Sequence, residues 1–272
     1  MNWTLKFSFA LCVVLSTTSA IFYSPKPIDS STSGLIDLSR FEKRVYSQNG
    51  EDGIIKKIFE LVGFNTGYFV EFGVQDGKEC NTRYIREAYG CAGLIMDGGY
   101  EDASINLQKE FITAENINDL FAKYDVPNEF DLLSIDLDFN DFHVWKAISN
   151  HYKPRVIVME FNSSHQPSED KVVPYDPNGC WDHSNYFGAS LLAMYNLGRA
   201  KGFSLVYVEN AGVNCFFIRD DILEGMSSKF LNVNDVEALY KKPKYGWGPN
   251  GGHPADPYDR PYLDSAGLLD NN

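Results

Sequence analysis

The sequence has 272 residues, enough for one large α/β domain or two small ones, and its 44% hydrophobic and 22% charged content is that of an ordinary globular protein. Acidic residues outnumber basic ones by 37 to 24, which gives a net charge of −13 at pH 7 and argues against a nucleic acid as partner. No apolar run approaches the length of a mature membrane span, and we favour a single domain.

The first twenty residues have the pattern of a signal peptide rather than of a folded domain. Lys6 precedes an apolar run at residues 7–15, and Thr18-Ser19-Ala20 supplies the small side chains of a cleavage site. The run is too short to span a bilayer, so an uncleaved membrane anchor is the alternative. We therefore expect residues 1–20 to be removed and the mature chain, with 23 basic and 37 acidic residues, to be secreted or to remain in the lumen of the secretory pathway.

An irregular leader is expected at residues 21–44, where Ser, Pro and Thr occur without a helical or strand period. A helix should begin in the following stretch, because Ile54, Ile55 and Ile58 form an apolar stripe at helical spacing. Asn49 and Asp52 resemble a capping arrangement at its start.

The rest of the chain is arranged around residues 67–82. Residues 67–72 read as a buried parallel strand that carries Glu71 near its carboxyl end, and Gly73 and Gly77 bracket a tight loop in which a missing Cβ lets the backbone approach a ligand. Asn81 or Thr82 can cap the helix that follows. A strand, a glycine turn and a helix form the usual nucleotide site of an open α/β sheet, whereas a turn that merely needs glycines is the alternative. The third glycine of the dinucleotide-binding motif G-x-G-x-x-G is missing, so a dinucleotide-binding Rossmann domain is the weaker fit.

Strand and helix patterns then alternate to the end of the domain. Strands are expected at residues 93–97, 111–114, 130–136, 156–160, 204–208 and 215–218, and a long helix at residues 187–201. Several of these strands end in an acidic residue. The alternation predicts an α/β fold with a mostly parallel sheet, helices on both faces and a ligand site at the carboxyl edge of the strands.

The motifs SQNGEDG, FVEFGVQDGKECNT, GLIMDG, DLLSIDLDFNDFHVWKAI, YKPRVIVMEFN and GVNCFFIRDD occur in this order over residues 46–221. Together they resemble the FkbM-like branch of the class I S-adenosylmethionine-dependent methyltransferases. The resemblance implies a three-layer Rossmann-like methyltransferase fold over residues 45–240, with a mostly parallel seven-stranded sheet that ends in an antiparallel hairpin. Relatives often carry a glycine where this chain has Phe139, which would crowd the loop beside the acceptor.

The resemblance also implies S-adenosylmethionine as the cofactor and assigns roles to individual residues. The methionine part would be held around the glycine loop, the ribose hydroxyls would bind the acid after the second strand, and the adenine would lie near an asparagine. The cofactor-binding residues implied in this way are Glu71, Gly73, Gly77, Asn81, Asp97, Asn116 and Asp136. The implied reaction is O-methylation of a hydroxyl on a small-molecule or glycan acceptor, and a non-catalytic binding or trafficking module with the same fold is the alternative.

Methyl transfer to oxygen requires positioning and a base that makes the acceptor nucleophilic. Asp138 and His143 follow the fourth strand and are the catalytic candidates. His165 and His183 lie on a loop at residues 162–186 that is long enough to act as a lid. For each histidine, a purely structural role is the alternative.

A divalent metal ion is a further alternative at the same edge. The acids after the fourth strand, and Glu160 after the fifth, offer the oxygen ligands that magnesium or calcium prefers. The stretch after the fourth strand lacks the glycine and the glutamate of an EF-hand loop, so no metal ligands are assigned.

Four cysteines remain after the predicted cleavage, in a compartment that permits disulfides. We expect Cys80 to pair with Cys180, because both follow strand ends at the carboxyl edge, while Cys91 and Cys215 stay reduced; four unpaired thiols are the alternative. Neither a CxxC motif nor a Cys/His spacing typical of zinc is present.

Two expectations concern the surface. Asn162-Ser163-Ser164 is the only glycosylation sequon of the mature chain. It directly follows the fifth strand, where a bulky glycan would compete with the ligand pocket, so we expect little or no glycan there. Residues 241–272 form a Pro- and Gly-rich tail, whose four large aromatic residues favour wrapping around the domain over a free tail.

Overall fold

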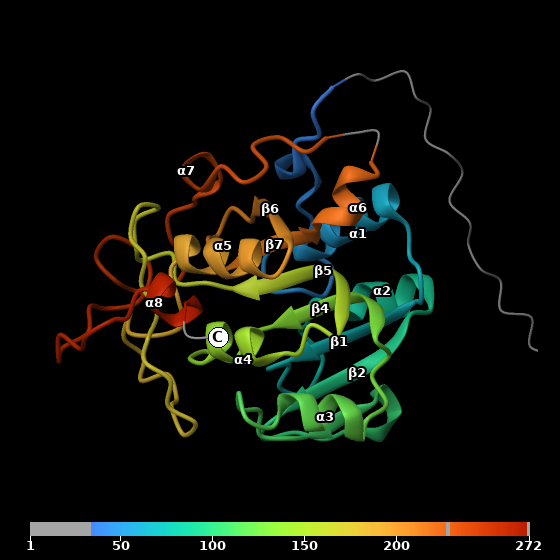
Figure 1. The fold of residues 1–272 in the computed structure, drawn as a ribbon, viewed down its shortest axis with the longest axis horizontal. Coiled ribbons are helices and arrows are strands. Elements are labelled where there is room, and N and C mark those ends of the chain that lie inside the picture. The colour runs from blue at the N-terminus through green and yellow to red at the C-terminus, as the bar shows by residue number, and fades with distance from the viewer. Residues whose placement is uncertain (1–33, 227–228, 271–272) are drawn as a thin grey trace, which may run out of the picture.

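The computed structural model describes residues 34–226 and 229–270. The predicted signal peptide and the first part of the predicted leader lie outside the described residues. The described chain forms a central sheet covered by helices on two faces (Figure 1).

The sheet contains seven strands in the order β3-β2-β1-β4-β5-β7-β6. The strands are β1 Tyr68–Phe72, β2 Ala92–Asp97, β3 Leu107–Lys109, β4 Glu129–Ile135, β5 Lys153–Glu160, β6 Phe203–Val208 and β7 Asn214–Arg219. β1 to β5 run parallel, whereas β7 is antiparallel to both β5 and β6. The predicted fold class is therefore confirmed: a three-layer α/β fold with a mostly parallel sheet and an antiparallel hairpin at its end.

Helices on the two faces make the layers. The α-helices are α1 Glu51–Val62, α2 Arg83–Tyr89, α3 Ile117–Lys123, α4 Asp141–Ala147, α5 Leu191–Ala200, α6 Asp220–Glu224, α7 Val236–Leu239 and α8 Ser265–Leu269, and the 3₁₀ helices are η1 Leu38–Phe41 and η2 Ala103–Ile105. α1 packs against α2, and α3, α4 and α5 pack in series on the opposite face (Figure 1). None of the helices in the described ranges is long and apolar enough to cross a membrane.

The core explains why most strands could be read from the sequence. Helices cover β4 and β5 on both sides, so apolar residues follow one another directly in these strands, and Leu132, Leu133, Ile157 and Val158 are fully buried. Such runs need no alternation, so their length and their flanking turns identify them.

Two local predictions are wrong. The third strand lies at Leu107–Lys109, not at residues 111–114, which instead form the turn before α3: the amide of Thr113 donates to the side chain of Asn116 (2.8 Å). Asn49 does not cap α1. Ser47 and Asp52 do so reciprocally, because the Ser47 hydroxyl donates to Asp52 (2.8 Å) and accepts from its amide (3.2 Å).

The tail packs on the domain, as its aromatic residues predict. Leu263 pairs with Val172 through two backbone hydrogen bonds of 2.8 Å, and the hydroxyl of Tyr262 donates to the carbonyl of Asn185 (3.1 Å). The tail therefore lies beside the long loop that follows β5, at the carboxyl edge of the sheet (Figure 1).

Candidate functional site

The glycine loop after β1 forms the centre of the carboxyl edge. Gly73 and Gly77 both have positive φ angles of 70°. A Cβ on Gly73 would collide with the carbonyl oxygen of Asp136, and one on Gly77 would come within 2.7 Å of the Ile105 side chain. Both positions thus require glycine, and Gly73 brings the loop after β1 against the loop after β4. In a sheet of this order, the gap between β1 and β4 is the switch point at which α/β proteins bind ligands.

Glu71 lies beneath this loop rather than in it. The side chain is buried, and its two oxygens accept hydrogen bonds from the amides of Asn81 (2.7 Å) and Thr82 (2.9 Å) and from the hydroxyls of Thr82 (2.6 Å) and Ser134 (3.2 Å). Burial raises the pKa of Glu71, and these donors oppose the rise. Asn81 is also buried, with its amide on Ser134 (3.1 Å). Both residues hold the loop in shape, and a direct contact with a cofactor stays a prediction.

Asp97 ends β2 beside the same loop. One carboxylate oxygen accepts from the amide of Gln75 (2.7 Å) and the other from the amide of Gly99 (2.7 Å). Gln75 has a φ of 50°, which is unusual for a residue with a side chain. Asp97 thereby ties the loops after β1 and β2 together, and each of its oxygens can accept a second donor, such as a ribose hydroxyl.

Asn116, which was predicted to lie near the adenine, uses its side chain to hold the backbone of its own turn. Its side chain accepts from the amide of Thr113 and donates to the carbonyl of Phe111 (2.8 Å each). The sequence analysis missed the neighbouring Phe111, a residue that is 57% exposed and whose ring lies 3.4 Å from the position of a Cβ on Gly98. Phe111 stands two residues after the end of β3, and this ring offers a flat apolar face close to Gly98, the residue that follows β2.

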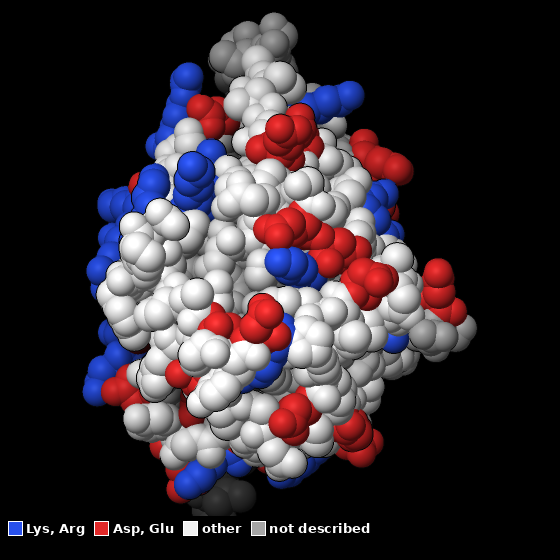
Figure 2. All heavy atoms as spheres, turned by 90° about the vertical axis from the view of Figure 1, so that its left-hand side faces the viewer, with Lys and Arg blue, Asp and Glu red and all other residues white. Residues whose placement is uncertain are grey.

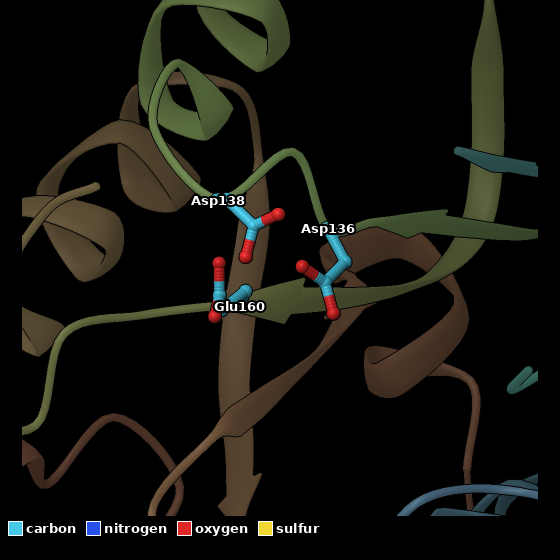
Figure 3. Close-up of side chains that lie close together, drawn as sticks. All are labelled: Asp136, Asp138 and Glu160. Atoms are coloured by element: carbon cyan, nitrogen blue, oxygen red, sulfur yellow. The ribbon is translucent and has the colours of Figure 1, made fainter. Parts of the chain in front are cut away.

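Three carboxylates meet where β4 and β5 end. Oxygens of Asp136, Asp138 and Glu160 all lie within 4.8 Å of one another, and the side chains point toward a common centre (Figure 3). One oxygen of Glu160 and one of Asp141 are buried without a hydrogen-bond partner in the described part of the chain. The edge thus gathers the two predicted residues, Asp136 and Asp138, with Glu160.

Burial and mutual repulsion make these acids weak. Burial, followed by the charges of neighbouring acids, raises the pKa values of Asp136 and Glu160 well above their ordinary range. Burial raises the pKa of Asp141 to about 7. The pKa of Asp138 is raised by burial and by the charge of Asp97, while the charge of His183 opposes the rise. The cluster therefore holds protons near neutral pH or accepts a cation.

The candidate base His143 contacts the long loop and is not part of this cluster. It is buried, and its Nε2 donates to the carbonyl of Val173 (2.7 Å), while its ring packs against Tyr175 with centroids 5.3 Å apart. Through these contacts His143 stabilises the position of the long loop, and its role as a base stays a prediction. Asp138, in contrast, is exposed at the edge with a φ of 60°.

The loop at residues 161–190 docks on the loop that carries Asp138. Asn140 donates to the carbonyl of Asp176 (2.8 Å), and the Phe139 ring packs against Tyr186 at 6.3 Å and fills the space beside Gly179. Phe139 is buried rather than projecting into the site, so it anchors the loop instead of crowding the edge.

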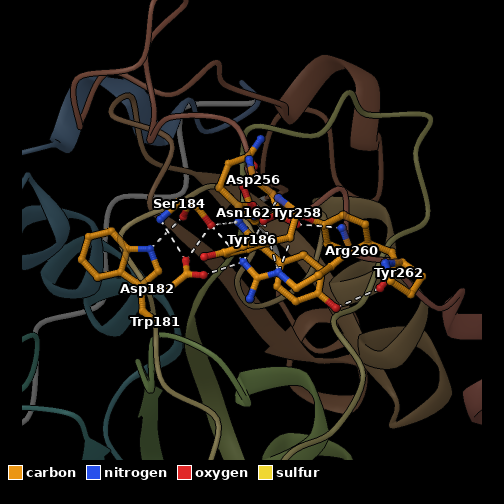
Figure 4. A network of polar contacts seen from close by, with 11 residues as sticks. Asn162, Trp181, Asp182, Ser184, Tyr186, Asp256, Tyr258, Arg260 and Tyr262 are labelled. Carbon is orange, nitrogen blue, oxygen red and sulfur yellow. Dashed lines mark hydrogen bonds and ion pairs between the residues drawn. The ribbon is translucent and has the colours of Figure 1, made fainter.

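Arg260 of the tail connects the tail to this loop through ion pairs and a cation–π contact. Its guanidinium lies 2.5 Å from Asp182 and 2.9 Å from Asp256, and it covers the ring of Tyr186 at 4.0 Å (Figure 4). The Arg260 hydrogen bonds lower the pKa of Asp256 to about 2. The loop and the tail thus form one wall of the carboxyl edge, which we call the clasp (residues 182–187 and 254–263).

The predicted Cys80–Cys180 disulfide is not formed. All four cysteines in the described ranges are free thiols. Cys80 is buried and directs its sulfur to the carbonyl of Gly77 (3.6 Å), whereas Cys180 is exposed and directs its sulfur to the carbonyl of Asn178 (3.7 Å). The sequence placed both residues at the correct edge, but not at the same depth. Burial also raises the thiol pKa of Cys91 to about 12.

Comparisons with known proteins give little beyond the fold. No protein-family model matches the chain, and no curated protein matches it in sequence. Among solved structures, it is similar to a SAM-dependent methyltransferase from Aquifex aeolicus with 15% identity and a TM-score of 0.30, over 60% of this chain and 87% of that one. A match this distant carries no functional argument, so the function is inferred from the site itself.

Proposed function

We propose that this protein is an S-adenosylmethionine-dependent O-methyltransferase of the FkbM-like branch, acting in the secretory pathway on a hydroxyl of a small molecule or glycan. The observation that supports it best is the approach of Gly73 to Asp136 at the β1/β4 switch point, with Asp97 closing the next loop. This is the place and the set of residue types that the sequence motifs predict for the cofactor.

The residues at the edge fit such a cofactor. Asp97 has acceptor capacity left for ribose hydroxyls, the Phe111 ring offers a face for a flat base, and the glycine loop exposes backbone at Gly73. The cofactor supplies, when bound, a methyl group on a positively charged sulfur. The carboxylates around Asp136 favour a positive charge at this edge, because their own charges repel one another in the cluster of Figure 3.

The chain itself would position the acceptor and take its proton. Asp138 is the exposed member of the carboxylate cluster, and its raised pKa makes it a stronger base than an ordinary aspartate. Its carboxylate oxygen would hold the proton that leaves the acceptor hydroxyl. His143 would act indirectly, since it fixes the long loop through the carbonyl of Val173.

Calorimetry with S-adenosylhomocysteine tests the cofactor assignment. We expect the full chain to bind it and Asp97→Ala to bind at least about tenfold more weakly, because hydrogen bonds to a charged group contribute roughly 1.5–3 kcal/mol. Glu224→Ala is the matched control, since this exposed acid lies on α6, which follows β7. Because β7 runs antiparallel to β5, α6 lies at the edge of the sheet opposite to the candidate site. Absence of binding by the unmutated protein would contradict the proposal and favour a binding module that has lost turnover.

A metal-assisted reaction at the same edge is the second candidate. Three carboxylates within 4.8 Å, with a buried Glu160 oxygen that no described group satisfies, form a donor set suited to magnesium, calcium or manganese. Such an ion would lower the pKa of an acceptor hydroxyl beside Asp138.

Titration with each of these ions separates the two candidates. For a metal site we expect saturable heat that Asp138→Asn reduces at least about tenfold, and weaker binding as the pH falls, because protons compete for the carboxylates. Asp259→Asn serves as the control, since Asp259 is an exposed tail acid whose positive φ an asparagine also adopts. Equal heats for both variants would exclude this site.

A further inference from the structure

Aromatic side chains gather around His253 in the tail. The ring centroid of His253 lies 4.4 Å from that of Trp181, 5.2 Å from Tyr245, 5.5 Å from Trp247 and 5.7 Å from Phe187. We call these five residues the His253 cluster. Trp247 is 65% exposed, and the buried Nδ1 of His253 has no hydrogen-bond partner among the described residues. Trp247 therefore presents aromatic surface to solvent at the edge of the cluster, while Phe187 is buried beneath it.

Hydrogen bonds connect the cluster to the segment that follows β5, the strand that ends in Glu160. The hydroxyl of Ser163, three residues after Glu160, donates to the Tyr245 hydroxyl (3.2 Å). The side chain of Asn162 donates to the carbonyl of Phe187 (3.0 Å). Tyr245 of the tail and Phe187 of the loop are therefore hydrogen-bonded directly to the residues that follow Glu160.

A second connection leads to Asp138. The ring of His183 packs at a tilt against Trp181 with centroids 4.6 Å apart, and a positive charge on His183 opposes the rise in the pKa of Asp138. The backbone of His183 has a φ of 71°, in the left-handed region, as does Asp138 with 60°. Strained positions of this kind persist where the surroundings hold them, and they are common at functional sites.

The charges at this edge restrict what can bind. Figure 2 faces the side on which the parallel strands end, and acidic side chains lie across the middle of that face with a few basic ones between them. Arg260, the cation of the clasp, is already bound to Asp182 and Asp256. An anionic acceptor would be repelled by whichever of Asp136, Asp138 and Glu160 is ionised, whereas an uncharged one would not.

We propose that the His253 cluster is the acceptor subsite and that it holds an uncharged, hydroxyl-bearing ring, a neutral sugar residue, with one hydroxyl directed toward Asp138. This inference rests on the proposed methyltransferase function. The exposed Trp247 receives the apolar face of the ring, with the half-buried Trp181 beside it, and the unpartnered Nδ1 of His253 binds one of its hydroxyls. Burial lowers the pKa of His253, which keeps the imidazole neutral and able to accept.

Saturation-transfer NMR on the full chain tests the subsite with maltotriose, cellotriose and tri-N-acetylchitotriose as neutral probes and trigalacturonate as the anionic one. We expect transfer to at least one neutral trisaccharide and none to trigalacturonate. Trp247→Ala, whose ring is mostly exposed, should weaken the neutral probe at least about fivefold, because stacking on that face is lost. Tyr258→Ala is the control, since Tyr258 is 75% exposed in the same tail but outside the cluster.

Binding of S-adenosylhomocysteine, measured on the same samples, separates this proposal from the one on which it rests. Trp247→Ala should keep that affinity. Sugar binding without S-adenosylhomocysteine binding would support the subsite and contradict the methyltransferase. Cofactor binding with no response to any neutral trisaccharide, or equal weakening by Trp247→Ala and Tyr258→Ala, would overturn the subsite. Trp181→Phe, which keeps an aromatic face, should bind more strongly than Trp181→Ala.

Discussion

At the carboxyl edge, backbone geometry restricts which residue type can occupy some positions, independently of any role in catalysis. Gly73 has nearly the same positive φ as Gly90, the left-handed residue that ends α2 (70° and 68°), but the two differ in surroundings. A Cβ at Gly90 meets nothing within 4 Å, whereas one at Gly73 collides with the carbonyl of Asp136. The pair therefore separates the strain of a positive φ from the need for close approach between the two loops.

We predict that Gly73→Ala loses more stability than Gly90→Ala. Each substitution forces an alanine to adopt a positive φ, at a cost of roughly 1–2 kcal/mol, and only Gly73→Ala must also displace the Asp136 loop. Urea unfolding of both variants measures the difference. Gly73→Ala should also weaken S-adenosylhomocysteine binding, while Gly90→Ala should not. Identical unfolding and binding would show that the loops do not need to touch.

The roles of individual residues were only partly predictable from the sequence. Glycine and acid positions follow from the strand and turn pattern, so Gly73, Asp97 and Asp136 could be placed at one edge. The depth of a side chain depends on distant partners: Glu71 is buried by Ser134, sixty-three residues away in the chain, and His143 is committed to Val173. No local pattern contains those contacts.

At the scale of elements, the clasp depends on one cation. Arg260 bridges Asp182 in the loop and Asp256 in the tail and stacks on Tyr186. We predict that Arg260→Gln accelerates amide hydrogen exchange at residues 182–187 and 254–263 about tenfold or more, because local opening no longer breaks these contacts. Global unfolding should change little, since the pairs are partly exposed.

Hydrogen exchange with mass spectrometry checks the clasp, with Lys242→Gln as the control. Lys242 is an exposed basic residue of the same tail. Uniform protection across the clasp in Arg260→Gln would mean that the bridge at Leu263 and Val172 holds the tail without the arginine.

The loop and the tail also meet at His165, which predicts sensitivity to acid. The side chain is buried against Tyr262, with centroids 4.8 Å apart, and its Nε2 has no partner in the described ranges. Burial, aided by the charge of Lys171 and opposed by that of Glu169, lowers its pKa to about 4. The unfolded chain, with an ordinary histidine pKa near 6.5, takes up the proton first as the pH falls.

Stability should therefore be lost as the pH falls from about 6.5 to about 4. His165→Phe keeps the ring contact and cannot be protonated, so we predict that it gains up to roughly 3 kcal/mol over the unmutated protein across this window. Urea unfolding between pH 7.5 and pH 4 measures the difference between the two curves, which removes the contribution of the carboxylates. His151→Phe, at an exposed position, is the control. Parallel curves for His165→Phe and the unmutated protein would refute the prediction.

Elements were predictable in proportion to their burial. β4 and β5 are covered on both faces and carry neighbouring apolar residues, whereas the three-residue β3 at the edge of the sheet has one buried residue, Leu107. Its pattern is too short to distinguish from the turn that follows. The clasp has no periodicity, because hydrogen bonds to side chains replace regular backbone pairing there.

At the scale of the whole molecule, the sheet order follows from the alternation of strands and helices, which leaves few topologies for a chain of this length. The arrangement of the loops above the sheet does not follow from it. The expected Cys80–Cys180 bridge shows this, since both residues lie at the carboxyl edge and still differ in burial. The wrapping of the tail could be predicted from its aromatic residues, but its position beside the β5 loop could not.

The predicted lack of glycan at Asn162 gains a physical reason from the fold. Asn162 is fully buried, and its Nδ2, the atom that would carry the sugar, donates to the carbonyls of Asn185 (2.8 Å) and Phe187 (3.0 Å). A glycan would break both bonds and displace the loop that carries the clasp and part of the His253 cluster. Because glycans are added to the chain before folding is complete, an occupied Asn162 should prevent this loop from closing.

We therefore expect protein secreted from animal cells to carry no glycan at Asn162, although the sequon is intact. Cys180→Ser supplies a matched positive control, because it completes a sequon at Asn178, an exposed asparagine on the same loop. Intact mass spectrometry of the secreted material should show one glycan in Cys180→Ser and none in the unmutated protein. A glycan at Asn162 in folded, secreted protein would mean that the loop after β5 does not close on Asn162 as the structure has it.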